Sequence, residues 1–498
     1  MAKRKRTEAP SNEVPITETN APKKSKSSAG AAAAATKEST TPLTIQVVAG
    51  SYDRVLHGIT VTIGAKGDAE FADSFLFGAH LSAIRCLAIS PPSAPAPGQR
   101  QKVLLASGST DERINVYNLS AHAPSRRDEK LLATVGPRPI LEDPKNRELG
   151  TLLHHTSSVA RLAFPTRSKL LSCGEDSSIA VTRTRDWNLL STIKTPIPKP
   201  QGRPSGDTAP FGGTPAGVND FAIDPSMKVM ISVSKGERCM RLWNLVTGKK
   251  AGVLNFGRET LAEIGEGKHA SGEGRRVVWG STPDGDEFCV GFDRDIVVYD
   301  MAAVPKCRVL GSIRTKVHQF SYVVVDDETE ATVLAVSTED GRVLFYSTTT
   351  EDLVGPEANG SEKTRAMPTA KLLGQIGGKE EGVSMRIKDF AVVDNSQGGT
   401  RRVFIIGGSS DGKVRVWKLE LDKLRRGSKQ RPQQVGRLLG TYETQNRITC
   451  LVAFAMIPRP EGAEDSEDEE EDEGGEAESE SDDDEDEDEA EIDGDEAQ

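Results

Sequence analysis

A hairpin signal recurs seven times along this chain of 498 residues, and it constrains the fold more than any other feature of the sequence. Each time, an acidic residue in a turn stands six positions before the last core-facing residue of the following strand. The seven turn residues are Asp53, Asp111, Asp176, Glu237, Asp293, Asp340 and Asp411. Acidic side chains bond to nearby backbone in turns, and the alternating apolar residues after them mark strands. The recurrence predicts an array of one repeated unit.

Each unit expands into four strands when its flanks are included. In the first complete unit, the pattern predicts strands at 81–90, 103–108, 113–119 and 130–135. This strand-turn-strand order, with an aromatic residue closing the third strand, resembles WD40 repeats, and Gly78-Ala79-His80 resembles their Gly-His element. Seven such units would close an all-β, seven-bladed WD40 β-propeller, whose radial repetition leaves only short sheet edges.

The seventh unit is divided between the two ends of the repeat region. One inner strand is expected at 447–454, and the three strands that it lacks are expected at 45–50, 55–61 and 71–77. An unclosed propeller would expose two sheet edges. We therefore predict a seventh blade that is closed by both termini.

Charge divides the chain into three parts. Residues 461–498 contain 25 Asp and Glu and no Lys or Arg, so the other 460 residues carry 63 basic against 50 acidic side chains. Like-charged blocks of this length do not collapse. We expect a disordered basic arm at 1–42, the propeller at 43–458 and a disordered acidic tail at 459–498. No stretch of the sequence has the apolar length needed to span a bilayer, so no membrane association is expected.

The two tails carry candidate address and modification sites. Two basic clusters predict nuclear import through an importin-type receptor, with a solvated arm or an RNA contact as the alternatives. Their residues are Lys3, Arg4, Lys5, Arg6, Lys23, Lys24 and Lys26. In the acidic tail, Ser466, Ser479 and Ser481 precede carboxylates and suit an acidophilic kinase, although unmodified spacer serines are the alternative.

Several patterns that resemble catalytic or metal sites are better explained by structure. Residues 408–412 match G-x-S-x-G, but a nucleophile elbow needs a strand-to-helix turn, whereas strands flank this turn on both sides. His80, Ser107 or Ser109, and Asp111 are the residue types of a catalytic triad, yet in WD40 proteins they form a hydrogen-bonded strut between strands. The six cysteines are scattered, and the histidines lack ligand spacing. We therefore expect no enzymatic activity, metal or cofactor.

Basic residues are concentrated between the predicted sixth and seventh blades. They are Lys423, Arg425, Arg426, Lys429 and Arg431. A basic stripe is the electrostatic footprint of a phosphate backbone, so this segment is a candidate RNA-binding or partner-binding site. A solvated loop is the alternative, because no aromatic residues alternate with the charges.

Six segments give a narrower resemblance than the repeat alone. The chain is similar to the p21-activated-kinase-interacting WD40 family, whose fungal members are the maintenance-of-killer WD40 proteins. The segments are VVAGSYDRVLHGITV (47–61), GAHLSAIRCLAI (78–89), ASGSTDERINVYNL (106–119), LLHHTSSVARLAF (152–164), LSCGEDSSIAV (171–181) and RLWNLVTGK (241–249). Thr182-Arg183 departs from the Trp-Asp expected in blade two, so a stacked Trp is missing there.

The resemblance implies a nucleolar assembly factor of the large (60S) ribosomal subunit that works in early precursor particles beside a ribosomal-protein-L24-like factor. A basic ring and arm are compatible with rRNA, and an acidic tail with basic ribosomal proteins. The alternatives are a p21-activated-kinase-binding signalling regulator, since animal relatives are associated with that kinase, and a histone chaperone that would use the acidic tail.

Overall fold

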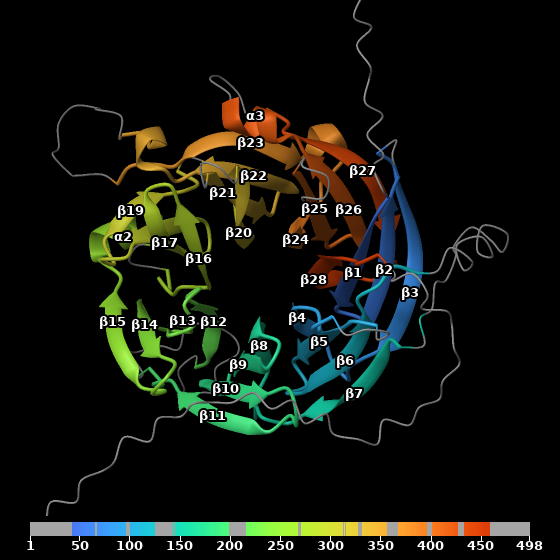
Figure 1. Ribbon diagram of the computed structural model, residues 1–498. Helices are drawn as coiled ribbons and strands as arrows, with labels where there is room; N and C mark the ends of the chain where they lie inside the picture. Colours follow the sequence, from blue (N-terminus) through green and yellow to red (C-terminus); the bar gives the residue numbers. More distant parts are fainter. Residues whose placement is uncertain are drawn as a thin grey trace, which may run out of the picture. The chain divides into compact units, whose positions relative to one another are not determined.

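The computed structural model describes residues 42–64, 67–95, 100–124, 143, 145–198, 216–266, 270–311, 313, 315–326, 331–355, 367–395, 401–426 and 433–458. Within these residues, seven antiparallel sheets of four strands each are arranged in a ring (Figure 1). The predicted all-β, seven-bladed propeller is therefore confirmed.

Each blade runs from an inner strand at the ring axis to an outer edge strand. Blade one contains β4 (Ile84–Ile89), β5 (Lys102–Ser109), β6 (Ile114–Ser120) and β7 (Arg147–Leu152). Blade two contains β8 (Val159–Thr166), β9 (Lys169–Gly174), β10 (Ser178–Arg183) and β11 (Leu189–Lys194). Blade three contains β12 (Val218–Ile223), β13 (Val229–Ser234), β14 (Cys239–Asn244) and β15 (Lys250–Asn255).

The next three blades repeat this order, with short helices in some connections. Blade four contains β16 (Arg276–Thr282), β17 (Gly285–Gly291), β18 (Ile296–Asp300) and β19 (Pro305–Arg308). Blade five contains β20 (Val317–Asp326), β21 (Ala331–Thr338), β22 (Arg342–Ser347) and β23 (Lys371–Gly377). Blade six contains β24 (Ile387–Asn395), β25 (Arg402–Ser409), β26 (Lys413–Leu419) and β27 (Gly436–Glu443). The helices are α2 (Arg258–Glu263), α3 (Leu421–Arg426), η1 (Thr350–Asp352) and η2 (Lys379–Glu381).

Blade seven is assembled from both ends of the repeat region, as the sequence predicted. Its inner strand β28 (Ile448–Ala455) pairs with β1 (Leu43–Ser51), and β2 (Val55–Ile63) and β3 (Ala69–Gly78) complete the sheet. The register places Val47 opposite Ala453 and Ala49 opposite Leu451. In Figure 1, orange-red β28 therefore lies beside blue β1.

The core lies between adjacent blades, because both faces of each sheet are covered. In blade six, Ile405 and Trp417 pack in one cluster with Phe345 of blade five. Their sequence neighbours Phe404 and Val416 point to the other face and pack with blade seven. Burying one such large apolar side chain contributes about 2 kcal/mol. Strands with period-2 side chains that are apolar on both faces are what this layered core requires.

One predicted strand was wrong. The fourth strand of blade one was expected at 130–135, which lies outside the described residues, whereas the strand that pairs with β6 is β7. The physical reason is exposure: all but the last residue of β7 are exposed, so this edge strand has no apolar alternation to reveal it. The apolar pattern at 130–135 indicated a strand there instead.

Candidate functional site

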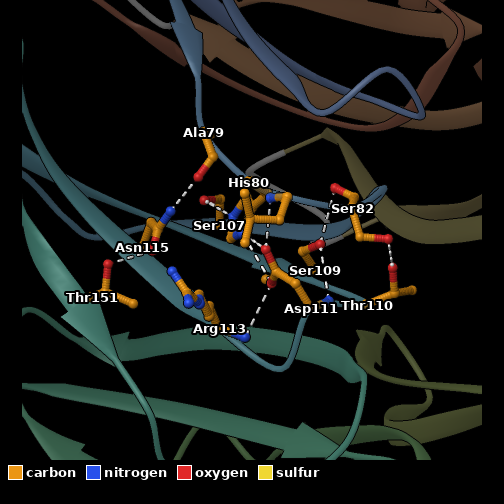
Figure 2. Close-up of polar contacts among 12 residues, drawn as sticks. Ala79, His80, Ser82, Ser107, Ser109, Thr110, Asp111, Arg113, Asn115 and Thr151 are labelled. Carbon is orange, nitrogen blue, oxygen red and sulfur yellow. Dashed lines mark hydrogen bonds and ion pairs between the residues drawn. The ribbon is translucent and has the colours of Figure 1, made fainter.

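Asp111 and His80 form a hydrogen-bond network that joins the β3–β4 loop to β5 and the β5–β6 turn of blade one, as Figure 2 shows. The Asp111 carboxylate accepts hydrogen bonds from the backbone N–H groups of Leu81 (2.9 Å) and Arg113 (3.1 Å). It also accepts from His80 Nδ1 at 3.1 Å. A neutral ring then leaves Nε2 to accept from the Ser107 hydroxyl at 2.8 Å. Burial opposes ionisation, but these donors hold the pKa of Asp111 below its ordinary value.

This corner has the atom order of a catalytic triad but not its accessibility. The side chain of His80 is 0% exposed, and Ser107 is fully buried. A nucleophile must reach its substrate, and this hydroxyl is enclosed by the strands that it joins. The arrangement therefore acts as the strut expected from the sequence.

Three other turn aspartates make related networks. In blade two, Asp176 accepts from His155 Nδ1 at 2.9 Å, and Ser172 lies 2.8 Å from the other ring nitrogen. Blades five and six use arginine in place of histidine, because Arg342 pairs with Asp340 and Arg415 pairs with Asp411.

The remaining two turn aspartates contact other segments. Asp53 accepts from the backbone N–H of Arg447 at 3.0 Å, so it joins a turn of the N-terminal strands to the loop before β28. Asp293 is paired with Arg275 and Lys316, each at 3.1 Å. In the Asp293 turn, it is Asp295 that accepts backbone hydrogen bonds, from Ile296 and Leu310.

The predicted basic segment lies elsewhere than expected. It connects β26 to β27 inside blade six, not blade six to blade seven, because β27 is the outer strand of blade six. Lys423 pairs with Glu420 at 2.6 Å, and Arg425 bonds Asp326 and the Val325 carbonyl of blade five, both at 3.1 Å. These two cations thus have partners within the chain. The side chain of Arg426, and the whole of Lys429 and Arg431, lie outside the described residues.

A different feature gathers positive charge at the ring axis. Six of the seven inner strands carry a β-bulge at the end where they begin, and only β16 pairs regularly there. In β4 the bulge falls at Arg85, in β20 at His318 and Gln319, and in β24 at Lys388. A bulge leaves a residue out of the ladder and redirects its side chain.

We call five side chains at this end of the inner strands the axial cluster. They come from blades one, two, four, five and six: Arg85, Arg161, Arg276, His318 and Lys388. The turns between the second and third strands of the blades lie at the same end, because neighbouring strands are antiparallel. We call this end of the ring the turn face. Lys316, Arg386 and Arg447 belong to its loops.

The axial cluster has more positive charge than carboxylates to balance it. Among the described residues, neither Arg276 nor Lys388 forms an ion pair, and Arg276 Nη1 is buried without a hydrogen-bond partner. Arg85 lies 3.6 Å from Glu175, and Arg161 lies 3.4 Å from Asp220. The buried carboxylates already accept backbone N–H groups, Asp220 from Val277 and Asp389 from Leu451.

The pKa values of Lys388 and His318 are lowered by burial and by this excess of positive charge. Burial, followed by the charges of Arg386, Lys316 and Arg447, lowers the pKa of Lys388 to about 8, against the opposing effect of Glu339. Burial, together with Lys388 and neighbouring arginines, lowers the pKa of His318 to about 3. Like charges held in a partly buried site disfavour further protonation. An anion placed on the axis would relieve this repulsion.

Sequence reasoning missed the axial cluster. Its one visible signal is a basic residue directly after the first apolar residue of an inner strand, as in Ile84-Arg85 and Ile387-Lys388. The bulge at these residues depends on pairing with the next strand, which a single sequence does not display.

Exposed apolar side chains lie on the same face. Leu81 in the β3–β4 loop is 69% exposed, Leu153 in the β7–β8 loop is 73% exposed, and Tyr52 in the β1–β2 turn is 59% exposed. A hydrogen bond of 3.2 Å from the Ala79 N–H to the Arg54 carbonyl joins the two loops that carry Leu81 and Tyr52. Blades seven, one and two therefore present an apolar arc beside the basic axis.

Other predicted features have the following positions. Both basic import clusters and the serines 466, 479 and 481 lie outside the described residues. All six cysteines are buried and unbridged. Within the described ranges, no group of three or more His, Cys, Asp or Glu side chains could hold a metal, and no helix is long and apolar enough to cross a membrane.

Comparison with known proteins gives the same fold and a narrower resemblance. The family model "WD domain, G-beta repeat" matches residues 146–181. The chain is 26% identical to Protein MAK11 of Saccharomyces cerevisiae over an alignment of 435 residues, which covers 82% of this chain and 82% of the relative. It is 24% identical to the p21-activated protein kinase-interacting protein 1-like of Danio rerio, covering 84% of this chain and 83% of the relative. The Gallus gallus protein of that name is 23% identical, with 82% and 80% covered. The chain is thus a WD40-repeat propeller whose resemblance to the maintenance-of-killer and p21-activated-kinase-interacting proteins extends over most of its length.

Proposed function

We propose that this protein is a non-catalytic nucleolar assembly factor that scaffolds early precursors of the large (60S) ribosomal subunit. The observation that carries the proposal is the axial cluster, in which Arg276 of blade four and Lys388 of blade six form no ion pair within the described residues, whereas Arg85 and Arg161 do. Such a face is built to bind an anionic partner rather than to perform chemistry. The family resemblance then supplies the particle in which the partner is found.

The charge distribution supports contacts of two kinds. The 460 residues before position 461 carry 13 more basic than acidic side chains, while the final segment carries 25 acidic ones. The basic part suits rRNA phosphates or acidic proteins, and the acidic segment suits basic ribosomal-type proteins. A ribosomal-protein-L24-like factor is the partner that the resemblance implies. Import through the clusters at positions 3–6 and 23–26 would deliver the protein to the nucleus.

Sedimentation tests the proposal. Affinity-tagged full-length protein should co-sediment on a sucrose gradient with large-subunit precursors, and the bound RNA should be precursor rRNA. A variant carrying Arg276→Gln and Lys388→Gln should move towards free protein. A matched variant should not, with Lys228→Gln in the exposed β12–β13 turn and Lys250→Gln on the edge strand β15. Absence of precursor rRNA from the wild-type fractions would contradict the proposal.

The predicted basic segment provides a second comparison. Replacement of Lys423, Arg425, Arg426, Lys429 and Arg431 by Glu should weaken particle association and flatten its salt dependence if these side chains neutralise phosphates. Arg425→Gln alone is the matched control, because it removes the contacts to Asp326 and Val325 without reversing charge.

A kinase-binding role is the second candidate, because the names of three vertebrate relatives describe proteins that interact with p21-activated kinase. That role predicts a kinase in the affinity eluate and a tagged protein outside the precursor fractions. A histone chaperone would instead bring histones into the eluate.

A further inference from the structure

We propose that the axial cluster and the apolar arc beside it form a docking site for an acidic peptide segment of a partner protein. Clustered carboxylates or phosphoserines would sit over the axis, and a neighbouring aliphatic side chain would cover Leu81 and Leu153. The inference rests on the proposed role as a binding scaffold, but not on which particle the protein scaffolds.

The first argument is the convergence of charge. Arg276 starts from blade four, yet its charge acts on His318 of blade five, Asp389 of blade six and Cys450 of blade seven. Arg161 of blade two likewise acts on Asp389, across the axis. Because the inner strands all begin at this end of the ring, the side chains near these beginnings surround one axis instead of following one strand. Such a centre suits a compact group of negative charges.

The second argument is that the chain leaves donors at this point unused. Arg276 Nη1 is buried and has no hydrogen-bond partner among the described residues. An orphaned buried donor is costly, and a ligand oxygen would satisfy it. Among the described residues, neither Asp220 nor Asp389 forms an ion pair or hydrogen bond with Arg276. Each of these carboxylates accepts two backbone N–H groups instead, one on its own strand and one on the next blade.

The composition of the arc favours a peptide over RNA. Single-stranded RNA is held by a cationic track with several aromatic side chains on which bases stack. The arc has one exposed aromatic ring, Tyr52, and the Arg447 guanidinium lies over it at 5.6 Å from the ring centre. Leu81 and Leu153 offer aliphatic surface, which fits an apolar peptide side chain. Exposed apolar residues beside a polar centre are typical of protein interaction sites.

The position of the C-terminal strand argues against this chain's own acidic tail as the occupant. β28 begins at the turn face and ends at the opposite face. Beyond it, Ile457 is held by Ala121 and Ala123 of blade one, through hydrogen bonds of 2.8 and 3.1 Å. Pro458, the last described residue, thus lies at the face opposite the axial cluster, so a segment from another protein has the more direct access to the cluster.

Fluorescence anisotropy with full-length protein tests the site. The probe is a labelled synthetic dodecapeptide of Glu and Asp with one central Leu, compared with a Gln and Asn version and with a uridine dodecamer. We expect the acidic peptide to bind the wild-type protein and the neutral one not to bind. Arg276→Gln with Lys388→Gln should weaken peptide binding at least about 10-fold, since two charge contacts are lost. Leu81→Ser with Leu153→Ser should weaken it by a smaller factor.

Matched controls make the outcome decisive. The variant Lys228→Gln with Lys250→Gln loses the same charge and should bind like wild type. Equal losses of affinity in this control and in the axial variant would overturn the proposal. Tighter binding of the uridine dodecamer that is weakened as much by the axial variant would also overturn it, because that result would identify an RNA site.

Replacing the acidic run 482–489 by Asn and Gln tests the tail: a rise in peptide affinity of about 10-fold would show that the tail occupies the site. Thermal unfolding of each variant verifies the fold, and these outcomes do not depend on sedimentation.

Discussion

Single carboxylates and cations at the turn face have opposite effects on stability. The carboxylates of the turn networks accept several donors each, as Asp111 and Asp176 do, and their pKa values are lowered. The Lys388 ammonium group forms no ion pair among the described residues. Its pKa is lowered because burial and neighbouring positive charges disfavour the charged form. The first kind of residue stabilises the ring, whereas the second stores unfavourable energy that a ligand can release.

Asp176→Asn is expected to destabilise blade two at neutral pH. Despite burial, hydrogen bonds from His155 and Ser178 lower the pKa of Asp176 to about 2, against 3.8 in the unfolded chain. The wild-type advantage is therefore complete above pH 4 and is lost as the pH falls through 2. It amounts to about 2 kcal/mol. Urea unfolding at pH 7 and pH 2 measures it, with exposed Asp286→Asn as the control. A loss that does not depend on pH would contradict the explanation.

Lys388→Met is expected to stabilise the protein. The pKa of Lys388 is about 8 in the folded state and 10.5 in the unfolded chain, so folding releases a proton between these values. Wild-type stability should rise with pH across that window, and the advantage of Met should be largest below pH 8 and vanish above about pH 10. With screening, we expect about 1 kcal/mol at pH 7. Thermal unfolding at pH 7 and pH 10 checks the sign, and a destabilised variant at pH 7 would show that Lys388 is held by a favourable contact.

At the scale of strands, the bulges and the blade-to-blade hydrogen bonds determine what the turn face displays. The inner strands of blades three and six each hold a buried Asp that reaches the next blade, from Asp220 to Val277 and from Asp389 to Leu451. The same inner strands are bulged one residue earlier. In these two blades a bulge therefore directly precedes the Asp that links neighbouring blades, and in blade six the bulged residue is Lys388.

Asp53→Ala is expected to weaken the link between the two termini. Asp53 accepts the Arg447 N–H at 3.0 Å, across the turn face of blade seven. Loss of this bond should cost about 1 kcal/mol. Denaturant unfolding measures the cost, and hydrogen exchange should show faster exchange in β1 and β28 before other strands. Uniformly faster exchange in every blade would indicate a general effect rather than a weakened closure.

At the scale of the whole ring, closure depends on contacts between residues some 400 positions apart. β1 pairs with β28 over seven residue pairs, and Ile457 extends the connection to blade one. Stability that is shared among neighbouring repeats requires that the ring have no open edge. Loss of one strand of blade seven would expose the edge of β28 and of the blades beside it.

Two N-terminal deletions distinguish the contribution of the blade-seven strands to stability from that of the preceding segment 1–42. Removal of residues 1–42 should leave the thermal midpoint nearly unchanged, because β1 begins at Leu43. Removal of residues 1–62 takes away β1 and nearly all of β2, and should give aggregated protein. Size-exclusion chromatography and thermal unfolding measure both, and a soluble fragment 63–498 that melts cooperatively would contradict closure by both termini.

The repeat pattern by itself determined the number of blades, the hairpins and the division of blade seven, because alternation of buried residues and turn chemistry are local properties of a chain. It failed at β7, whose exposed residues carry no alternation. Tertiary structure alone decided which side chains share the axis, since Arg161, Arg276 and Lys388 lie in different blades and come together only when the ring closes. It also showed that Arg425 bonds Asp326 of the neighbouring blade. Charge can be read from the sequence, but whether a charge already has a partner depends on distances that only the fold sets.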